Sequence, residues 1–229
     1  MSGKSKEAAW DRSRLLCASA GMAGCICFVA LAAAVVLQRG DLVAIDGAVS
    51  TWLASHRTTA FTDVMIVVTQ LHSTAGIHAM AVAACAVLLH RQRDWRTAGW
   101  LAVSVSSSSL LNVGLKHVFI RARPADETAL LHLTSFSFPS GHALASTVWW
   151  GCVSYLFATI GRGAPAVAVA VTMVAATCLS RVYLGVHYPS DVAAGVCEGV
   201  VCVSFWVFIA RRHRDRIGLW SSLARPGHS

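Results

Sequence analysis

Charged side chains are scarce in this chain, because Asp, Glu, Lys and Arg make up only 13% of its 229 residues. Soluble domains carry about 25% charged residues, so these side chains are too few to coat a soluble globule of this length. Hydrophobic residues make up 55% of the sequence, which excludes a disordered chain and is not typical of a cytosolic enzyme. The composition therefore indicates an integral membrane protein.

Long stretches lack charge altogether, and the first of them is Leu15–Leu37. A helix of about 20 apolar residues crosses the hydrocarbon core of a bilayer, and this stretch is long enough. It follows a basic start, as in a signal peptide, but it exceeds the roughly 7–15 apolar residues of a signal-peptide core. We therefore expect an uncleaved membrane helix.

Five further apolar segments predict membrane spans, for a total of six in one all-α domain that covers residues 1–229. They lie within Phe61–Leu89 and at Thr97–Leu115, Gly141–Ile160, Ala164–Leu179 and Asp191–Ala210. Phe61–Leu89 is long enough for a short surface helix followed by a spanning one. Arg39–Ala60 has mixed polarity and predicts a short interfacial helix.

Lys and Arg are unevenly distributed between the two ends of these predicted spans. Those on the richer side are Lys4, Lys6, Arg12, Arg14, Arg91, Arg93, Arg96, Arg162, Arg211, Arg212, Arg214, Arg216 and Arg225. The positive-inside rule places this side in the cytoplasm, together with both termini. We expect the cell inner (plasma) membrane, with the poorer side facing outward and holding most of the potentially catalytic groups.

The eight cysteines form neither a disulfide framework nor a metal site. They are Cys17, Cys25, Cys27, Cys85, Cys152, Cys178, Cys197 and Cys202. All lie inside apolar stretches and no pair has zinc-like surroundings, so we expect small buried hydrophobic side chains. The net charge of +8 does not indicate nucleic acid as a partner, because the basic residues form short clusters between apolar segments and not a patch with interleaved aromatics.

Three short stretches at the outer ends of the predicted spans combine charged and catalytic residue types. They are Lys116–Pro124, Pro139-Ser140-Gly141-His142, and Ser180-Arg181 followed by His187 and Asp191. The residues that matter here are three cations (Lys116, Arg123 and Arg181), two histidines (His142 and His187), the carboxylate of Asp191 and a helix start with small residues. Phosphoryl transfer needs in-line positioning and neutralisation of the equatorial oxygens, so this inventory suits a phosphoryl group.

The cations and the helix start are the expected phosphate-binding groups. Lys116, Arg123 and Arg181 can neutralise phosphate oxygens, the two arginines through bidentate pairs. Ser140 precedes an apolar run and is expected to cap a helix. Gly141 has no Cβ to hinder approach to the free amides of that helix start, which can bind an anion.

The histidines are the expected catalytic groups. His187 and Asp191 are four residues apart, near the start of the sixth predicted span. A carboxylate at this spacing can accept a hydrogen bond from one ring nitrogen and leave the other as a nucleophile. His142 then remains to protonate the departing oxygen.

The three stretches resemble the signature of the type 2 phosphatidic acid phosphatase and vanadium haloperoxidase superfamily. That signature is Lys, six residues, Arg-Pro; then Pro-Ser-Gly-His; then Ser-Arg, five residues, His, three residues, Asp. Every spacing matches over Lys116–Asp191, about a third of the chain. The six-span plan is similar to the membrane branch of this superfamily. The resemblance implies a membrane lipid phosphate phosphatase whose phosphate is bound by Lys116, Arg123 and Arg181, with help from Ser140 and Gly141.

The resemblance also implies the catalytic roles. His187 would form a phosphohistidine, His142 would act as acid and then as base, and Asp191 would orient His187. The phosphatases of this family work without a metal, and no Cys, His or carboxylate cluster in the sequence offers a metal site. No cofactor is therefore expected.

A lipid substrate is expected because the catalytic groups lie at the membrane surface and the sequence has no large extramembrane domain. Undecaprenyl diphosphate is the first expectation, followed by phosphatidylglycerol phosphate and phosphatidate, a ranking that rests on the resemblance. The alternatives are phosphoryl transfer to another lipid or sugar, vanadate-dependent halide oxidation, which the membrane embedding disfavours, and an anion transporter. The transporter has thin support, since Glu198 is a lone intramembrane carboxylate.

Residues outside the motifs keep simpler interpretations. Arg121 is interpreted as an interfacial anchor. Glu198 is expected to face the bundle interior, protonated or bonded to serines of the third span. The remaining histidines are interpreted as interfacial or packed residues: His56, His72, His78, His90, His117, His132, His213 and His228.

Overall fold

The computed structural model of the chain describes residues 3–124, 129–131 and 133–212, and this part contains eight helices and no strand. The helices are α1 (Gly3–Val36), α2 (Gly40–Ser55), α3 (Thr59–Leu71), α4 (Thr74–Arg91), α5 (Trp95–Phe119), α6 (Gly141–Thr159), α7 (Gly163–Tyr183) and α8 (Pro189–Arg212). The all-α prediction is confirmed. His132, His213, His228 and the basic tail beyond Arg212 lie outside the described residues.

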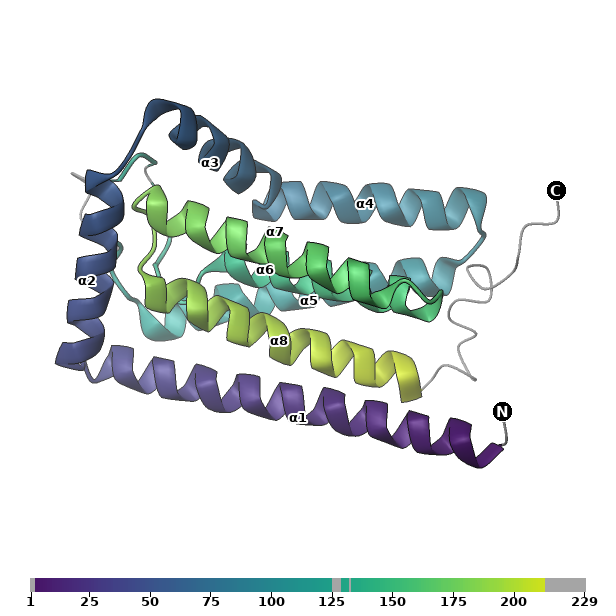
Figure 1. The fold of residues 1–229 in the computed structure, drawn as a ribbon. Coiled ribbons are helices and arrows are strands. Elements are labelled where there is room, and N and C mark those ends of the chain that lie inside the picture. Colours follow the sequence, from purple (N-terminus) through teal and green to yellow (C-terminus); the bar gives the residue numbers. More distant parts are fainter. Residues whose placement is uncertain (1–2, 125–128, 132, 213–229) are drawn as a thin grey trace.

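The helices form a bundle whose one end is crossed by α2 (Figure 1). α6 lies inside the bundle, where it packs against α4, α5, α7 and α8. α1 lies on the outside and packs mainly against α8. α2 and α3 connect α1 to α4, and both contact α7. The segments predicted as a surface helix and an interfacial helix therefore gather at one end of the bundle.

Five of the described helices are long and apolar enough to cross a membrane. The spans are Leu15–Val36, Thr74–Arg91, Trp95–Phe119, Gly163–Tyr183 and Pro189–Arg212. α6, the predicted fourth span, is not among them. Its surroundings are other helices, and its buried residues include Ser146, Thr147 and Ser154, which lower its hydropathy. Six spans therefore remain a prediction.

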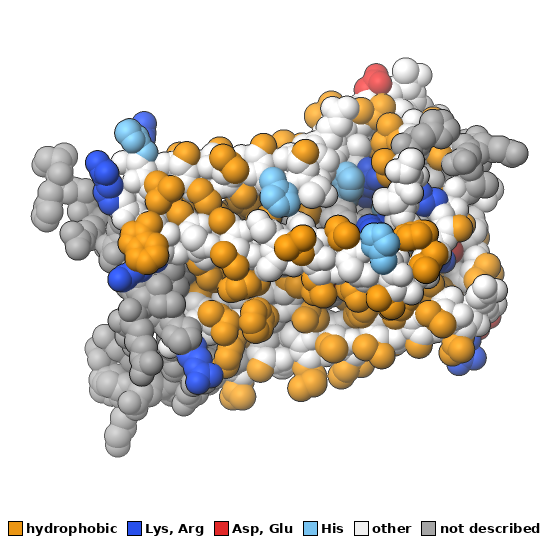
Figure 2. Space-filling view, turned by 180° about the vertical axis from the view of Figure 1, so that it is seen from behind, with side chains coloured by type: hydrophobic (Ala, Val, Ile, Leu, Met, Phe, Trp, Pro, Cys, Tyr) orange, Lys and Arg blue, Asp and Glu red, His pale blue; other side chains and the backbone are white. Residues whose placement is uncertain are grey.

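The flank of the bundle is apolar. Figure 2 shows hydrophobic side chains along its length, with Lys and Arg toward its two ends. Leu15, Ile26, Val82, Leu110 and Val171 are each more than 60% exposed. An apolar surface of this extent marks contact with a membrane or with a partner. Together with the five apolar helices, it indicates a multi-pass membrane protein.

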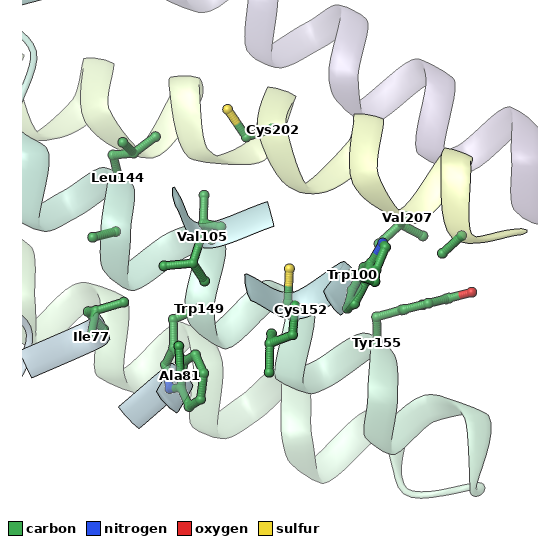
Figure 3. Packing of buried hydrophobic residues seen from close by; sticks show 14 residues of the cluster. Ile77, Ala81, Trp100, Val105, Leu144, Trp149, Cys152, Tyr155, Cys202 and Val207 are labelled. Atoms are coloured by element: carbon green, nitrogen blue, oxygen red, sulfur yellow. The ribbon is translucent and has the colours of Figure 1, made fainter. Parts of the chain in front are cut away.

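The core between α4, α5, α6 and α8 fixes the position of α6 (Figure 3). Ile77, Leu101, Leu144 and Val148 are each at most 1% exposed in this core. α4, α5 and α8 contribute side chains to this core together with α6, and α7 packs against α6 directly. These contacts hold the first turn of α6 against the ends of the neighbouring helices. That first turn carries part of the candidate site.

The cysteines differ from the sequence prediction. All eight are free thiols, but only Cys152 and Cys202 are buried. Cys25 and Cys27 are exposed on α1. The prediction of uniform burial is wrong for these two, because α1 packs mainly against α8 and its other faces point outward.

Two glycines let α8 approach α6 closely. A Cβ atom at Gly195 would lie 3.0 Å from the Cβ of Ala143 and would collide with the carbonyl oxygen of Ser140. A Cβ atom at Gly199, one turn later, would lie 2.6 Å from the Cβ of Thr147. Small residues at this spacing allow close helix packing in membranes. The contact fixes the start of α6 against the start of α8.

We expect Gly195→Ala to lower the free energy of unfolding in detergent by about 1–3 kcal/mol, because the added methyl group must displace backbone atoms of α6. Gly114→Ala on α5 is the matched control, since a Cβ there meets no heavy atom within 4 Å. Alanine is also the better helix former, so this control should lose no stability. Circular dichroism during titration with SDS measures both variants. Equal stability would contradict the close contact of α6 with α8.

Candidate active site

One pocket at the α2 end of the bundle collects residues from all three motif stretches. Its volume is about 240 Å³ and its lining includes Lys116, Arg123, Gly141, His142, Arg181 and His187. The other two predicted site residues, Ser140 and Asp191, are fully buried beside this lining. Residues from separate parts of the sequence therefore meet in one place.

Helix ends bring these residues together. Lys116 lies in the last turn of α5, and Gly141 begins α6. Arg181 lies in the last turn of α7, and Asp191 in the first turn of α8. The four helices alternate in direction along the bundle (Figure 1), so these ends share one side.

His187 lies in the turn between α7 and α8 and is 2% exposed. Its Nε2 atom is 3.3 Å from Nη1 of Arg123, and its Nδ1 atom is 3.4 Å from Oδ2 of Asp191. Burial lowers the pKa of His187 to about 3, and the hydrogen bond and charge of Asp191 offset only part of this shift. The imidazole is therefore neutral at neutral pH, and its Nε2 can act as a nucleophile.

The buried carboxylate of Asp191 has different partners on its two oxygens. Oδ2 accepts a hydrogen bond from Oγ of Ser137 at 2.5 Å and one from the amide of Tyr188 at 2.9 Å. Oδ1 accepts a hydrogen bond from Nη1 of Arg121 at 2.6 Å. These bonds fix the rotation of the carboxylate, so that Oδ2 faces His187.

Arg181 offers two hydrogen-bond donors to the pocket. Its side chain is almost fully buried, and Nη1 donates to Oγ1 of Thr69 on α3. Nε and Nη2 have no partner within the part of the chain that the structure describes. Buried donors without partners are costly, and a guanidinium fork suits the oxygens of a phosphate.

Lys116 and Arg123 bind the backbone that leads into α6 and out of α7. Nζ of Lys116 donates to the carbonyl oxygen of Phe136 at 2.6 Å. Nε of Arg123 donates to the carbonyl oxygen of Ser135 at 2.7 Å, and Nη1 donates to that of Val186 at 2.6 Å. Burial lowers the pKa of Arg123 below its ordinary value, but an arginine remains a cation in proteins. Both cations are thereby held at the pocket wall.

The start of α6 differs in one respect from the prediction. Ser140 occupies the N-cap position, but its side chain makes no capping hydrogen bond, and its amide donates to the carbonyl oxygen of Asp191 at 3.0 Å. The amide of Leu144 donates to the carbonyl oxygen of Ser140 at 3.1 Å. The amides of residues 141–143 precede this bond and have no acceptor within the helix, so they can bind an anion.

Arg121 is not an interfacial anchor, and that interpretation is wrong. Its guanidinium forms ion pairs with Asp46 at 2.8 Å and with Asp191 at 2.6 Å. Sequence reasoning also missed the contributions of Asp46, Thr69 and Ser137. The sequence contained one indication of Asp46, which lies inside the apolar segment 42–49. A carboxylate that is buried in such a segment needs a hydrogen-bonding or ionic partner.

Glu198 lies inside the bundle, as predicted, and is 4% exposed. Its Oε2 accepts a hydrogen bond from Nδ2 of Asn112 at 2.8 Å, so the serine bond, one of the two predicted alternatives, is wrong. The serines of α5 bond within their own helix instead, Ser104 to the carbonyl oxygen of Trp100 and Ser108 to that of Ser104. This use of serine is common in membrane helices. Asn112 itself lines the pocket.

A profile of the PAP2 superfamily matches residues 97–215, a range that contains all three motif stretches. Phosphatidylglycerophosphatase B of Bacillus subtilis is 29% identical over 180 residues, which cover 76% of this chain and 86% of that protein. Decaprenylphosphoryl-5-phosphoribose phosphatase of Mycobacterium tuberculosis is 33% identical over 123 residues. That match covers 52% of this chain and 63% of the relative, which is less than two thirds of its length.

A solved structure has a similar fold. It is the crystal structure of a transmembrane PAP2 type phosphatidylglycerolphosphate phosphatase from Bacillus subtilis, with a TM-score of 0.76 and 25% sequence identity. The match covers 86% of this chain and 96% of that chain. The similarity therefore extends beyond the region of the three motifs.

Proposed function

The chain belongs to the PAP2 superfamily, and from this premise we propose that it is an integral membrane phosphatase that hydrolyses a lipid phosphate through a phosphohistidine. The observation that carries the proposal is the pocket in which Lys116, Arg123 and Arg181 surround His142 and His187. Phosphoryl transfer requires mainly positioning and positive charge on the equatorial oxygens. This pocket supplies both, together with a neutral imidazole.

In the first step, Nε2 of His187 attacks the phosphorus atom in line with the bond to the lipid oxygen. An N–P bond forms as the P–O bond breaks, and the lipid alcohol leaves with a proton from His142, which enters this step as the imidazolium with its charge offset by the phosphate of the substrate. Asp191 accepts the hydrogen bond of Nδ1–H and stabilises the positive charge that His187 acquires.

In the second step, a water molecule attacks the phosphohistidine, and His142, now neutral, accepts its proton. An O–P bond forms, the N–P bond breaks, and inorganic phosphate leaves. His187 returns to its neutral form with the proton on Nδ1, still oriented by Asp191. The enzyme is then ready for another turnover.

The phosphate oxygens are assigned to the cations and to the start of α6. Arg181 is the main binding residue, since its Nε and Nη2 have no other partner among the described side chains. Lys116 and Arg123 add charge, while Ser140 and Gly141 assist from the helix start. The described residues contain no cluster of His, Cys, Asp or Glu that could hold a metal ion. The proposal therefore assigns the neutralising role to these side chains.

The substrate is proposed to be a lipid phosphate because the pocket lies at one end of the apolar helices. The relatives are named as phosphatases of phosphatidylglycerol phosphate and of decaprenylphosphoryl-5-phosphoribose. On this similarity, phosphatidylglycerol phosphate is the first substrate to test. Undecaprenyl diphosphate, the first expectation from the sequence, and phosphatidate are the alternatives.

We also propose that α6 forms a sixth span, within one domain that includes all the helices. Its 19 residues approach the length that a bilayer requires, and it lies between helices that reach that length. Six spans place both termini on one side. The positive-inside rule assigns that side to the cytoplasm and turns the pocket outward from the inner (plasma) membrane.

The experiment that tests this function measures phosphate release by the detergent-purified protein. The three lipids are supplied separately, with a chelator present and with His187→Ala as the control. Phosphate release that persists in the presence of the chelator and is absent from His187→Ala supports the metal-independent route. Less free phosphate than consumed substrate supports transfer to an acceptor. No release from any of the three lipids by folded protein would overturn the proposal.

Thr69→Val is expected to raise the KM for the lipid phosphate by about 3- to 10-fold, with a smaller change in kcat. Oγ1 of Thr69 accepts the hydrogen bond from Nη1 of Arg181, and valine keeps the shape of threonine but lacks this acceptor. Thr172→Val is the matched control, because the Thr172 hydroxyl bonds to the carbonyl oxygen of Ala168 in its own helix. Equal KM values would show that Thr69 does not hold Arg181.

A further inference from the structure

Behind Asp191, on the side away from His187, lies a buried chain of charges that the mechanism above does not use. Arg121 donates from Nη1 to Oδ1 of Asp191 at 2.6 Å and from Nη2 to Oδ2 of Asp46 at 2.8 Å. Asp46 is 1% exposed and Asp191 is fully buried. One guanidinium therefore joins the carboxylate of the candidate site to a carboxylate on α2.

Asp46 is also bonded to the first turn of α8. Its Oδ1 accepts a hydrogen bond from the amide of Ser190 at 2.9 Å, and its Oδ2 accepts one from the Ser190 hydroxyl. The same hydroxyl oxygen accepts a hydrogen bond from Nη1 of Arg121 at 2.8 Å. A carboxylate at a helix N-terminus is stabilised by the free amides and by the helix dipole. Asp46 thus ties α2 to the helix that carries Asp191.

The charges of Arg121, Asp46 and Asp191 depend on one another. Burial alone would lower the pKa of Arg121, but Asp191 and Asp46 outweigh burial and raise the pKa above its ordinary value. Removing one partner of a buried ion pair leaves an uncompensated charge, which is strongly unfavourable. Loss of Arg121 would leave Oδ1 of Asp191 without the cation, while loss of Asp46 would leave the pair of Arg121 with Asp191 intact.

We propose that Arg121 and Asp46 are positioning residues of the phosphatase reaction, which hold Asp191 ionised and turned so that its Oδ2 faces His187. The inference rests on the proposed function, because it assigns both residues to the same reaction. Neither residue lines the pocket of the motif residues, so neither touches the phosphate. Asp46 also lies outside residues 97–215, which the family profile matches. The assignment makes α2 a part of the active-site structure.

A second cavity makes this inference open to chemical rescue. Its volume is about 680 Å³, and its lining includes Asp46, Arg121 and Tyr188 together with residues from the end of α1. The guanidinium of Arg121 lies over the ring of Tyr188, 4.5 Å from the ring centre, and the side chain is 16% exposed. A guanidinium ion from solution can therefore reach the space that Arg121→Ala would leave.

The test compares Arg121→Ala, Asp46→Asn and their combination with the wild type in detergent. We expect Arg121→Ala to lower kcat by about 100-fold and to leave KM within about threefold, since only the orientation of His187 is lost. Asp46→Asn should lower kcat by about 10-fold, and the double variant should be no worse than Arg121→Ala alone, because both act through Asp191. Added guanidinium chloride should restore at least about a tenth of the lost kcat of Arg121→Ala.

The controls separate this inference from the proposed function. Arg39→Ala removes an exposed cation at the N-cap of α2, and its kcat should be unchanged with or without guanidinium. The positioning role would be overturned if Arg121→Ala kept its full kcat or changed only KM. It would also be overturned if kcat fell and added guanidinium did not restore it. If Arg121→Ala does not fold, Asp46→Asn is tested in its place. A full kcat in this variant, or a change in KM alone, would overturn the positioning role. A folded wild type that releases no phosphate would overturn the proposed function itself, and the positioning role with it.

Discussion

Replacing His187 by alanine is expected to lower kcat by roughly 10⁴-fold or more while the protein stays folded. In the proposed mechanism, Nε2 of His187 forms the covalent bond to the phosphoryl group, and a methyl group cannot replace it. Lys116 and Arg123 keep their bonds to backbone oxygens in the variant, and Arg123 loses only the 3.3 Å contact of its Nη1 with Nε2 of His187. Substrate binding should therefore survive, and the loss should appear in kcat.

Two measurements check this expectation. Steady-state phosphate release gives kcat and KM, and an alkaline quench after brief exposure to ³²P-labelled lipid traps the base-stable phosphohistidine on the protein. His56→Ala is the matched control, since His56 is exposed at the end of α2. Circular dichroism verifies the helical fold of both variants. Wild-type turnover in His187→Ala, or label retained on this variant, would remove the phosphohistidine mechanism.

The convergence of the motif residues on one pocket was predictable because it depends on local information. Lys116, Gly141 and Arg181 lie at helix ends that the apolar segments and the small residues mark in the sequence. Successive membrane helices alternate in direction, so alternate helix ends share one side of a bilayer. The order of the spans therefore indicates which ends meet, without any knowledge of how the helices pack.

The residues that hold the site in place could not be found in this way. Asp46 lies 144 positions before Ser190, and Thr69 lies 112 positions before Arg181. No periodic pattern relates such positions, because the contacts depend on how α2 and α3 fold over the end of the bundle (Figure 1). The interpretation of Arg121 failed for the same reason. A cation just after a membrane helix resembles an interfacial anchor until its carboxylate partners from two other helices are known.

Burial inside the bundle also explains why α6 is less hydropathic than the five candidate spans. A helix enclosed by other helices can place hydroxyl groups in its interfaces, as α6 does with Ser146 and Thr147. α1 packs mainly against α8 and is more apolar, with Ser19 as the one hydroxyl residue within Leu15–Val36. The hydroxyl groups that α6 buries therefore lower its hydropathy, although its first turn carries part of the site.

His142→Ala is expected to lower kcat on a lipid phosphate by about 10²- to 10⁴-fold. With p-nitrophenyl phosphate, the same variant should slow the first step, in which the leaving group departs, much less. The lipid alkoxide needs a proton to leave, whereas nitrophenolate is stable without one. His142 lies in the first turn of α6 and lines the same pocket as His187, which suits this proton transfer. His117→Ala, at an exposed position beside Lys116, is the control and should show no dependence on the leaving group.

The second step provides an independent check on His142, because hydrolysis of the phosphohistidine needs a base whichever group has left. With p-nitrophenyl phosphate, His142→Ala should therefore release a stoichiometric burst of nitrophenolate, followed by slow turnover, and alkali-stable label should accumulate on His187. The wild type, which has the base, should show no burst. If His142 only shaped the pocket, both substrates would lose the same factor and no label would accumulate. That result would assign the proton transfers to a group other than His142.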